Sequence, residues 1–250
     1  MSYLTQTYET MGVELDPSID YFDLDSRFLT TEETLRSIPP GKFCDLGCGR
    51  GAVIRRVQDH HEVYGTEFDP GLVEFCQRDA LQVKLLDLNV ADSLPFDSTR
   101  FDVIAISEVC EHLLDPRHAL TVAYEGLAAG GTMIVTVPNA VPLFARLRLL
   151  FGCTVDWLHY PSVDTERTGH LRFYTAESIE KLLREIGFTE VTIRGVSFRM
   201  NGVFWARVCH WLPKLAGKPS KASATRIDAW FGRVAPGLSP GLFVECKKKQ

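Results

Sequence analysis

The chain has 250 residues, of which 45% are hydrophobic and 24% are charged, with a formal net charge of −5. This balance is typical of a soluble globular protein with a substantial core, and no run of about 18 apolar residues predicts a membrane-spanning helix. The seven cysteines are scattered and never spaced C-x-x-C. We therefore expect neither a disulfide framework nor a zinc site, and a cytoplasmic location.

The charge is unevenly distributed along the chain. Residues 199–250 carry ten Lys or Arg against two acids, a net charge of +8, and the rest of the chain carries −13. An acidic body disfavours nucleic acid as a partner, whereas the basic C-terminal part can face an anionic surface.

Residues 1–38 precede the first predicted strand, and we expect them to form an N-terminal cap. The sequence 30–36 predicts a helix, with Thr30 or Thr31 as its N-cap and acids in its first turn. If the cap closes over a ligand site, Arg27 can offer a cation there. The alternative is that this segment packs against the outside of the domain.

Residues 42–52 read K-F-C-D-L-G-C-G-R-G-A, which predicts a buried strand, a glycine turn and a helix. This layout brings a nucleotide-like ligand against bare backbone, and glycines are needed where a Cβ would block the turn or the ligand. The glycines also fit the G-x-G-x-x-G/A fingerprint of NAD and FAD binders. Asp45 favours a different ligand, because its carboxylate would repel a pyrophosphate but suits an ammonium group.

The next three predicted strands cover residues 62–67, 82–86 and 100–107. The first of them ends in Glu67, an acid that can accept both hydroxyls of an adenosine ribose. Because NAD binders also carry such an acid, Glu67 indicates an adenosyl ligand without choosing between ligands. A turn at A-A-G-G, residues 128–131, leads to a fifth strand at 132–137.

Residues 139–174 are irregular and rich in aromatic side chains, and we interpret them as a substrate lid above the carboxyl ends of the strands. A helix capped by Thr175 and ended by Gly187 follows. The last two strands are predicted at 189–196 and 241–247.

The insertion at 198–240 separates these two strands, and its segment 204–217 carries an apolar stripe near basic residues. It is either an interfacial helix that touches a membrane or lipidic substrate, or a helix packed on the protein's own core.

Taken together, these motifs resemble the class I methyltransferases that depend on S-adenosylmethionine (SAM). The sequence D-L-G-C-G-R-G at 45–51 is similar to their [DE]-x-G-x-G-x-G motif. F-D-V-I at 101–104, E-H-L at 111–113 and V-P-N at 137–139 are similar to the group that acts on small molecules, lipidic quinol precursors or sugars.

The resemblance implies one α/β domain over residues 1–250. Its fold would be a Rossmann-like, doubly wound, seven-stranded sheet, mostly parallel with an antiparallel last strand and with helices on both faces. SAM would be the cofactor. The implied cofactor-binding residues are Asp45, Gly47, Cys48, Gly49, Gly51, Glu67, Phe68, Asp87, Leu88 and Ser107. Asp87 would lie near the adenine amino group, with Asp92 as the reserve candidate.

The expected reaction is methyl transfer to a small, partly apolar acceptor, which can be lipid-linked, at a hydroxyl oxygen. A hydroxyl needs help to lose its proton, so His112 and His170 are candidate bases, although each can instead be structural. The lid offers four aromatic candidates for substrate contacts: Trp157, His159, Tyr160 and Tyr174. No carboxylate cluster is spaced for magnesium, so we expect no metal. The alternatives are a tRNA or protein methyltransferase, a non-catalytic SAM-binding protein and, more remotely, an NAD-dependent oxidoreductase.

Overall fold

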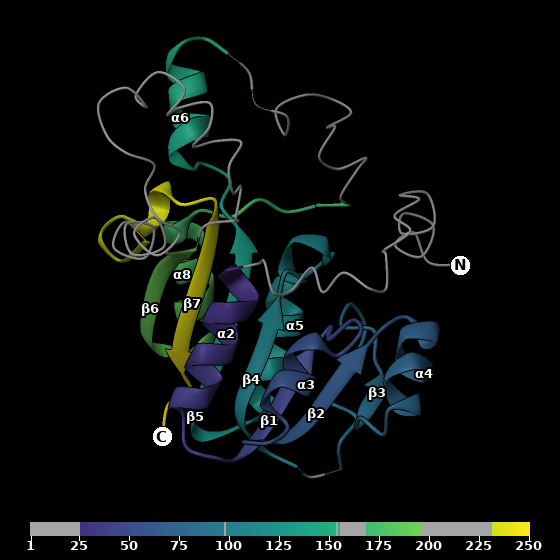
Figure 1. Ribbon diagram of the computed structural model, residues 1–250. Coiled ribbons are helices and arrows are strands. Elements are labelled where there is room, and N and C mark those ends of the chain that lie inside the picture. Colours follow the sequence, from purple (N-terminus) through teal and green to yellow (C-terminus); the bar gives the residue numbers. More distant parts are fainter. Residues whose placement is uncertain (1–25, 98, 154, 156–168, 197–231) are drawn as a thin grey trace, which may run out of the picture.

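The computed structural model describes residues 26–97, 99–153, 155, 169–196 and 232–250, which form a sheet covered by helices on both faces (Figure 1). The sheet has seven strands in the order β3-β2-β1-β4-β5-β7-β6. The strands are β1 (Lys42–Leu46), β2 (Glu62–Glu67), β3 (Val83–Leu85), β4 (Phe101–Ser107), β5 (Leu127–Pro138), β6 (Thr189–Val196) and β7 (Gly241–Lys247).

Strands β1 to β5 pair in parallel, and β7 lies antiparallel between β5 and β6. This topology confirms the predicted fold class.

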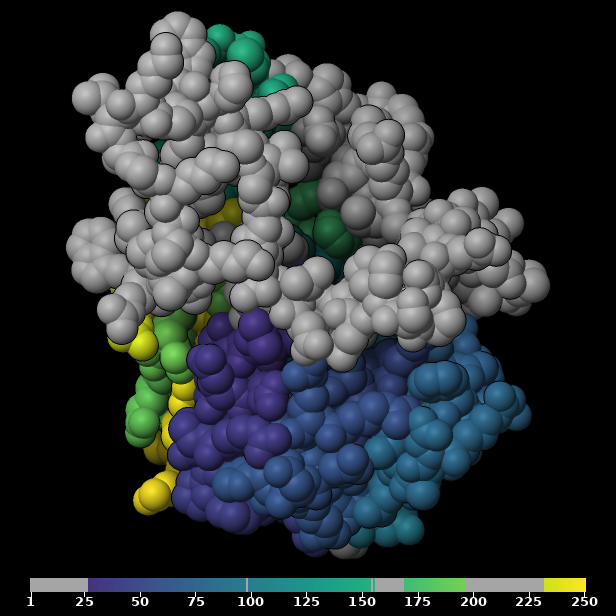
Figure 2. Space-filling model, in the orientation of Figure 1, coloured from purple at the N-terminus to yellow at the C-terminus, as the bar shows by residue number. Residues whose placement is uncertain are grey.

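Two apolar cores flank the sheet because side chains alternate along each strand. One face is covered by α2 (Ser26–Ser37), α3 (Ala52–Val57) and α4 (Pro70–Arg78), and the other by α5 (Pro116–Gly126) and α8 (Ala176–Ile186). The space-filling view looks onto the first of these faces, with α2 in purple beside the blue of α3 and α4 (Figure 2).

Helix α8 begins and ends as the sequence predicts. The Thr175 Oγ1 accepts from the Ser178 N–H at 3.1 Å, and the Ser178 Oγ accepts from the Thr175 N–H at 2.8 Å, which makes a reciprocal cap. Gly187, at φ +120°, follows the last turn.

Three local predictions were wrong. Helix α2 begins at Ser26, so Thr31 is not its cap but a buried interior residue whose hydroxyl donates to the Arg27 carbonyl at 2.9 Å. Strand β5 begins at Leu127, so the A-A-G-G segment belongs to the strand, with a register shift opposite 101–103 instead of a turn. The predicted lid is not irregular throughout, because it contains the helix α6 (Leu143–Leu150).

Several predicted features lie outside the described residues. They include most of the N-terminal cap, most of the insertion at 198–240, and the candidate substrate residues Trp157, His159 and Tyr160. Two short 3-10 helices, η2 (Cys110–His112) and η4 (Pro236–Leu238), complete the described elements. Within this part of the chain, every helix is too short or too polar to cross a membrane.

Candidate active site

Polar side chains occupy the carboxyl ends of four neighbouring strands on the face covered by α2, α3 and α4. They are Asp45 of β1, Glu67 of β2, Ser107 of β4 and Thr136 of β5. The alternation of side chains explains the shared face, because the residues two positions earlier on three of these strands belong to the core beneath α2 to α4: Phe43, Ala105 and Ile134. Ligands of α/β sheets bind at this edge.

The glycine loop after β1 is held by hydrogen bonds from its own backbone. The N–H groups of Gly47 and Cys48 donate to the Thr66 carbonyl at 2.8 and 3.0 Å. The Gly49 N–H donates to the Glu67 Oε2 at 2.9 Å. The loop therefore connects the ends of β1 and β2 directly.

The three glycines of the loop serve different purposes. A Cβ on Gly47 would lie 2.5 Å from the Val109 side chain, and a Cβ on Gly51 would lie 2.8 Å from that of Leu81. Gly49 has φ +55°, and a Cβ there would meet no atom within 4 Å. Gly47 and Gly51 are thus required by packing, whereas Gly49 borders open space that a ligand can approach.

Glu67 is the most constrained side chain of the site. It is 4% exposed, and its Oε1 accepts from the N–H groups of Phe68 and Asp69 at 2.8 and 3.1 Å. Together with the bond from Gly49, three backbone donors use three of about four acceptor positions on the carboxylate. These three hydrogen bonds hold the remaining acceptor position of Glu67 in a fixed orientation.

Asp45 is also 4% exposed, and its neighbourhood disfavours ionisation. Burial, and next the charge of Glu67, raise the pKa of Asp45 from 3.8 to about 7. A cationic ligand group is well matched to this pair of acids, because a positive charge nearby lowers the cost of ionising Asp45.

Two buried hydroxyls on this face make no hydrogen bond within the described part of the chain. The Ser107 Oγ and the Thr136 Oγ1 are buried and have no hydrogen-bond partner among the described residues. The two residues are paired across β4 and β5. Buried hydroxyls are costly without a partner, so a polar ligand group at this position would be favoured.

The strand β4 continues into Glu108, which has φ +56° and forms an ion pair with Arg27 of α2. Their side chains are only 14% and 17% exposed for Arg27 and Glu108, respectively. The pair fastens the start of α2 to the end of β4, beside Ser107. Arg27 thus lies at the edge of the site with its charge paired to Glu108, a partner that the sequence did not indicate.

The remaining cofactor candidates differ in their surroundings. Phe68 is partly exposed beside Glu67, and Cys48 is buried with a thiol pKa that burial raises. Asp87 is exposed, and its Oδ1 accepts from the backbone and side-chain nitrogens of Asn89 at 2.9 and 3.0 Å. The side chain of Leu88 belongs to the apolar core. The part of Leu88 that can contact a cofactor is therefore its backbone.

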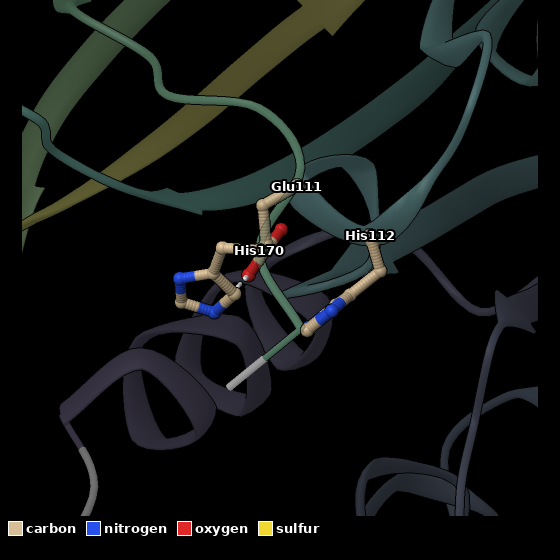
Figure 3. Close-up of side chains that lie close together, drawn as sticks. All are labelled: Glu111, His112 and His170. Atoms are coloured by element: carbon tan, nitrogen blue, oxygen red, sulfur yellow. Dashed lines mark ion pairs between the residues drawn. The ribbon is translucent and has the colours of Figure 1, made fainter. Parts of the chain in front are cut away.

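Glu111, His112 and His170 form a second polar cluster (Figure 3). One ligand atom from each side chain lies within 4.8 Å of the others, and Glu111 Oε1 is 4.0 Å from His170 Nε2. The imidazole centroids of His112 and His170 are 4.9 Å apart. The structure thus brings together the two histidines proposed as bases. Glu111 was not among the predicted site residues, because no spacing in the sequence relates it to His170.

Tyr174, one of the predicted substrate contacts, has a structural role in the core. It is 6% exposed, packs in the core on the α5 and α8 face, and donates its hydroxyl to the Cys110 carbonyl at 3.2 Å. Burial raises the pKa of its phenol. The hydroxyl of Tyr174 therefore holds η2 in place, and its role as a substrate contact stays a prediction.

Comparison with known proteins agrees with this geometry. Residues 21–193 match the family described as "Methyltransferase domain". The chain belongs to this family. The match confirms the resemblance drawn from the motifs and includes every residue of the two polar clusters.

Curated methyltransferases with similar sequences include the ubiquinone biosynthesis O-methyltransferases. That of Cereibacter sphaeroides is 30% identical over 170 residues, covering 66% of each chain. The mitochondrial enzyme of Mus musculus is 22% identical over 189 residues, covering 68% of this chain and 46% of its own. The chain thus spans two thirds or less of the length of these relatives.

Solved methyltransferase structures share the fold. A SAM-dependent methyltransferase from Thermotoga maritima superposes with a TM-score of 0.59 at 18% identity over 90% of both chains. The phosphoethanolamine N-methyltransferase 2 of Haemonchus contortus, in complex with SAM, gives a TM-score of 0.61 at 14% identity, covering 89% of this chain and 52% of its own.

The residues present fit SAM as the cofactor. The space beside Gly49, the two buried hydroxyls and the carboxylates of Asp45 and Glu67 lie at one edge of the sheet. A ligand with ribose hydroxyls, an ammonium and a carboxylate has a complement for each of these groups.

Proposed function

We propose that this methyltransferase-family chain transfers a methyl group from SAM to a hydroxyl oxygen of a small, partly apolar acceptor. The observation that carries the proposal is the acidic pair Asp45 and Glu67 beside the open space at Gly49. The cluster of His112 and His170 follows at the end of the neighbouring strand β4. The similarity to ubiquinone biosynthesis O-methyltransferases supports a hydroxyl acceptor.

The cofactor end of the site would be organised by fixed side chains. Glu67, oriented by three backbone donors, would accept a ribose hydroxyl at its remaining acceptor position, and Asp45 would face the ammonium group. The Ser107 and Thr136 hydroxyls would donate to the carboxylate of the same ligand. Asp87, two residues past the end of β3, would lie beyond the ribose at the adenine. Positions fixed in advance cost little reorganisation when the reaction occurs.

At the acceptor end, the chain must align a hydroxyl and manage its proton. The sulfonium methyl of bound SAM supplies the electrophile, so positioning accounts for much of the rate. His112 and His170 are the two histidines of this cluster, and an imidazole can take a proton near neutral pH. His112 lies in η2 just after β4, and the segment that carries His170 is hydrogen-bonded to η2.

We further propose that residues 1–250 form a single domain, in which residues 1–38 cap the site and residues 139–174 form the acceptor lid. A lipid-linked acceptor would then be reached from an anionic surface through the insertion at 198–240. Helix α6 supports a surface contact, because Phe144, Leu150 and Phe151 are 57%, 76% and 78% exposed and Arg146 and Arg148 lie among them.

A methyl-transfer assay with labelled SAM tests the proposal on a panel of hydroxyl acceptors that range from phenols with an apolar tail to free sugars. We expect label in a phenol with an apolar tail, and a loss of about 10²–10⁴-fold in turnover for His112→Ala or His170→Ala, the usual effect of a positioned base. Binding of NADH but not of S-adenosylhomocysteine would overturn the proposal. Flotation with vesicles containing phosphatidylserine tests the surface contact separately. If the chain does not bind these vesicles even at low salt, the surface contact is refuted.

A further inference from the structure

Three side chains with the chemistry of metal ligands converge beyond the end of β4. Glu111, His112 and His170 each offer one ligand atom within 4.8 Å of the others. Figure 3 shows these side chains approaching one another from η2 and from the segment that carries His170. We propose that Glu111, His112 and His170 bind a divalent first-row transition-metal ion.

The backbone of both segments is held in a defined relative position. The N–H groups of Leu171 and Arg172 donate to the Glu111 carbonyl at 2.7 and 3.0 Å. From below, the Tyr174 hydroxyl donates to the Cys110 carbonyl. These bonds fix residue 170 beside residues 111 and 112, although they lie far apart in the sequence, so the convergence is a built feature of the fold and not a chance approach of mobile side chains.

A further contact orients one of the proposed ligands. The His112 Nδ1 lies 3.3 Å from the Gly169 carbonyl. A carbonyl only accepts hydrogen bonds, so Nδ1 must carry the proton, and the lone pair of the neutral ring is then on Nε2. Histidine ligands in metal sites are typically oriented in this way, with the second ring nitrogen donating to a backbone carbonyl or a carboxylate.

The donor set indicates the class of metal. Two imidazoles and one carboxylate suit zinc, iron, cobalt or manganese better than magnesium, which prefers oxygen ligands alone. Ligand atoms around a tetrahedral ion with bonds of about 2.1 Å are roughly 3.4 Å apart, so the ligand atoms of the three side chains must approach one another by up to about 1.4 Å. Glu111 is 1% exposed, and a cation beside it offsets the cost of holding a charged carboxylate away from water.

Three protein ligands leave at least one coordination position open. This part of the inference rests on the proposed hydroxyl acceptor. With the acceptor oxygen in the open position, the ion would lower the pKa of that hydroxyl and fix its oxygen in place. The hydroxyl proton leaves to solvent, the new bond forms between oxygen and the methyl carbon, and the methyl–sulfur bond breaks, with its electron pair staying on sulfur. Neither histidine needs to act as a free base.

Cobalt binding tests the site without any substrate. The full chain is freed of metal by dialysis against a chelator and titrated with Co²⁺, whose visible absorption reports nitrogen and oxygen ligands, and Zn²⁺ is then added as a competitor. The variants are Glu111→Gln and His170→Ala. The matched control is His118→Ala, since the Nε2 of His118 also lies near a backbone carbonyl, at 2.9 Å from that of Ala91, but away from this cluster.

We expect the wild type and His118→Ala to bind one equivalent of Co²⁺, displaced by Zn²⁺. Both cluster variants should lose more than about 100-fold in affinity, since even second-shell changes cost 10–100-fold. S-adenosylhomocysteine affinity and circular dichroism should be unchanged; His170 is partly exposed, so His170→Ala preserves the test if Glu111→Gln fails to fold. Wild type without bound Co²⁺, equal binding in all four proteins, or an intense thiolate band in place of the visible bands would each overturn the inference.

The metal inference and the proposed function can fail separately. Co²⁺ binding at the cluster without methylation of any hydroxyl acceptor would refute the proposed function and leave the metal site standing. Hydroxyl methylation that persists in chelator-dialysed protein which binds no Co²⁺ would refute the metal site and leave the function standing.

Discussion

Asp45 ties cofactor affinity to pH in a way that the structure makes quantitative. Its carboxyl is 4% exposed, and its pKa is raised to about 7 by burial and by the charge of Glu67. If the ammonium-bearing end of the ligand requires ionised Asp45, the protein must first lose that proton. Apparent affinity then follows the ionised fraction, which rises from about 3% at pH 5.5 to about 75% at pH 7.5.

We therefore expect S-adenosylhomocysteine to bind roughly 25-fold more tightly at pH 7.5 than at pH 5.5. Calorimetry over this range measures the effect, and the ligand's own amino group, with a pKa of about 7.7–8.0, is still mostly charged at its upper end. Asp45→Asn should bind weakly at both pH values, with most of the slope removed. Asp102→Asn is the matched control, because the Asp102 carboxylate accepts from the Lys42 N–H at the opposite edge of the sheet.

The same pKa predicts an opposite effect on stability. Because the folded-state pKa lies above the unfolded value of 3.8, the folded chain binds more protons between the two, and stability falls as pH rises from about 4 to about 7. Asp45→Asn removes this loss, so at pH 8 the variant should gain on the order of 4 kcal/mol at most, and near pH 4 nothing. A wild-type affinity that does not change with pH, or an unaltered slope in Asp45→Asn, would refute the reasoning.

Three further variants address the remaining parts of the site. Gly49→Val should abolish S-adenosylhomocysteine binding in calorimetry while the fold persists, and Gly152→Val is its control, since Gly152 also has positive φ and open space around its Cβ; equal losses in both would contradict a ligand beside Gly49. Glu67→Gln keeps one acceptor oxygen but can turn a donor toward the Gly49 N–H, so binding should weaken by about 1.5–3 kcal/mol, and an unchanged dissociation constant would exclude Glu67 from the ribose. Arg27→Ala breaks a largely buried ion pair and should lower the free energy of unfolding by about 1–3 kcal/mol, whereas Arg36→Ala, at an exposed pair, should change it much less in denaturant titrations; similar losses would place Arg27 among the ordinary surface cations.

Local sequence pattern determined most of the sheet and one helix. The strands at 62–67, 189–196 and 241–247 were predicted with the bounds that the structure gives. Apolar alternation and glycine placement act within a few residues, so they can be identified without tertiary context. The cap of α8 was predicted for the same reason, since Thr175 and Ser178 are neighbours in the chain.

The start of α2 was decided by tertiary contacts. Thr30 and Thr31 are good caps by residue type, yet the helix begins at Ser26, and its first turn holds Arg27 against Glu108. That ion pair joins residues 81 positions apart. Local propensity is a weak preference that such long-range contacts override.

The site itself divides in the same way. Asp45, Gly49 and Glu67 follow from the chain alone, because each ends a strand or forms the turn after it, and parallel strands end at one edge. The pKa of Asp45 needed the fold, because it depends on burial and on the distance to Glu67. The cluster of Glu111, His112 and His170 also needed the fold, because a backbone ladder from residues 171 and 172 to Glu111 brings distant segments together, and no spacing in the sequence encodes that contact.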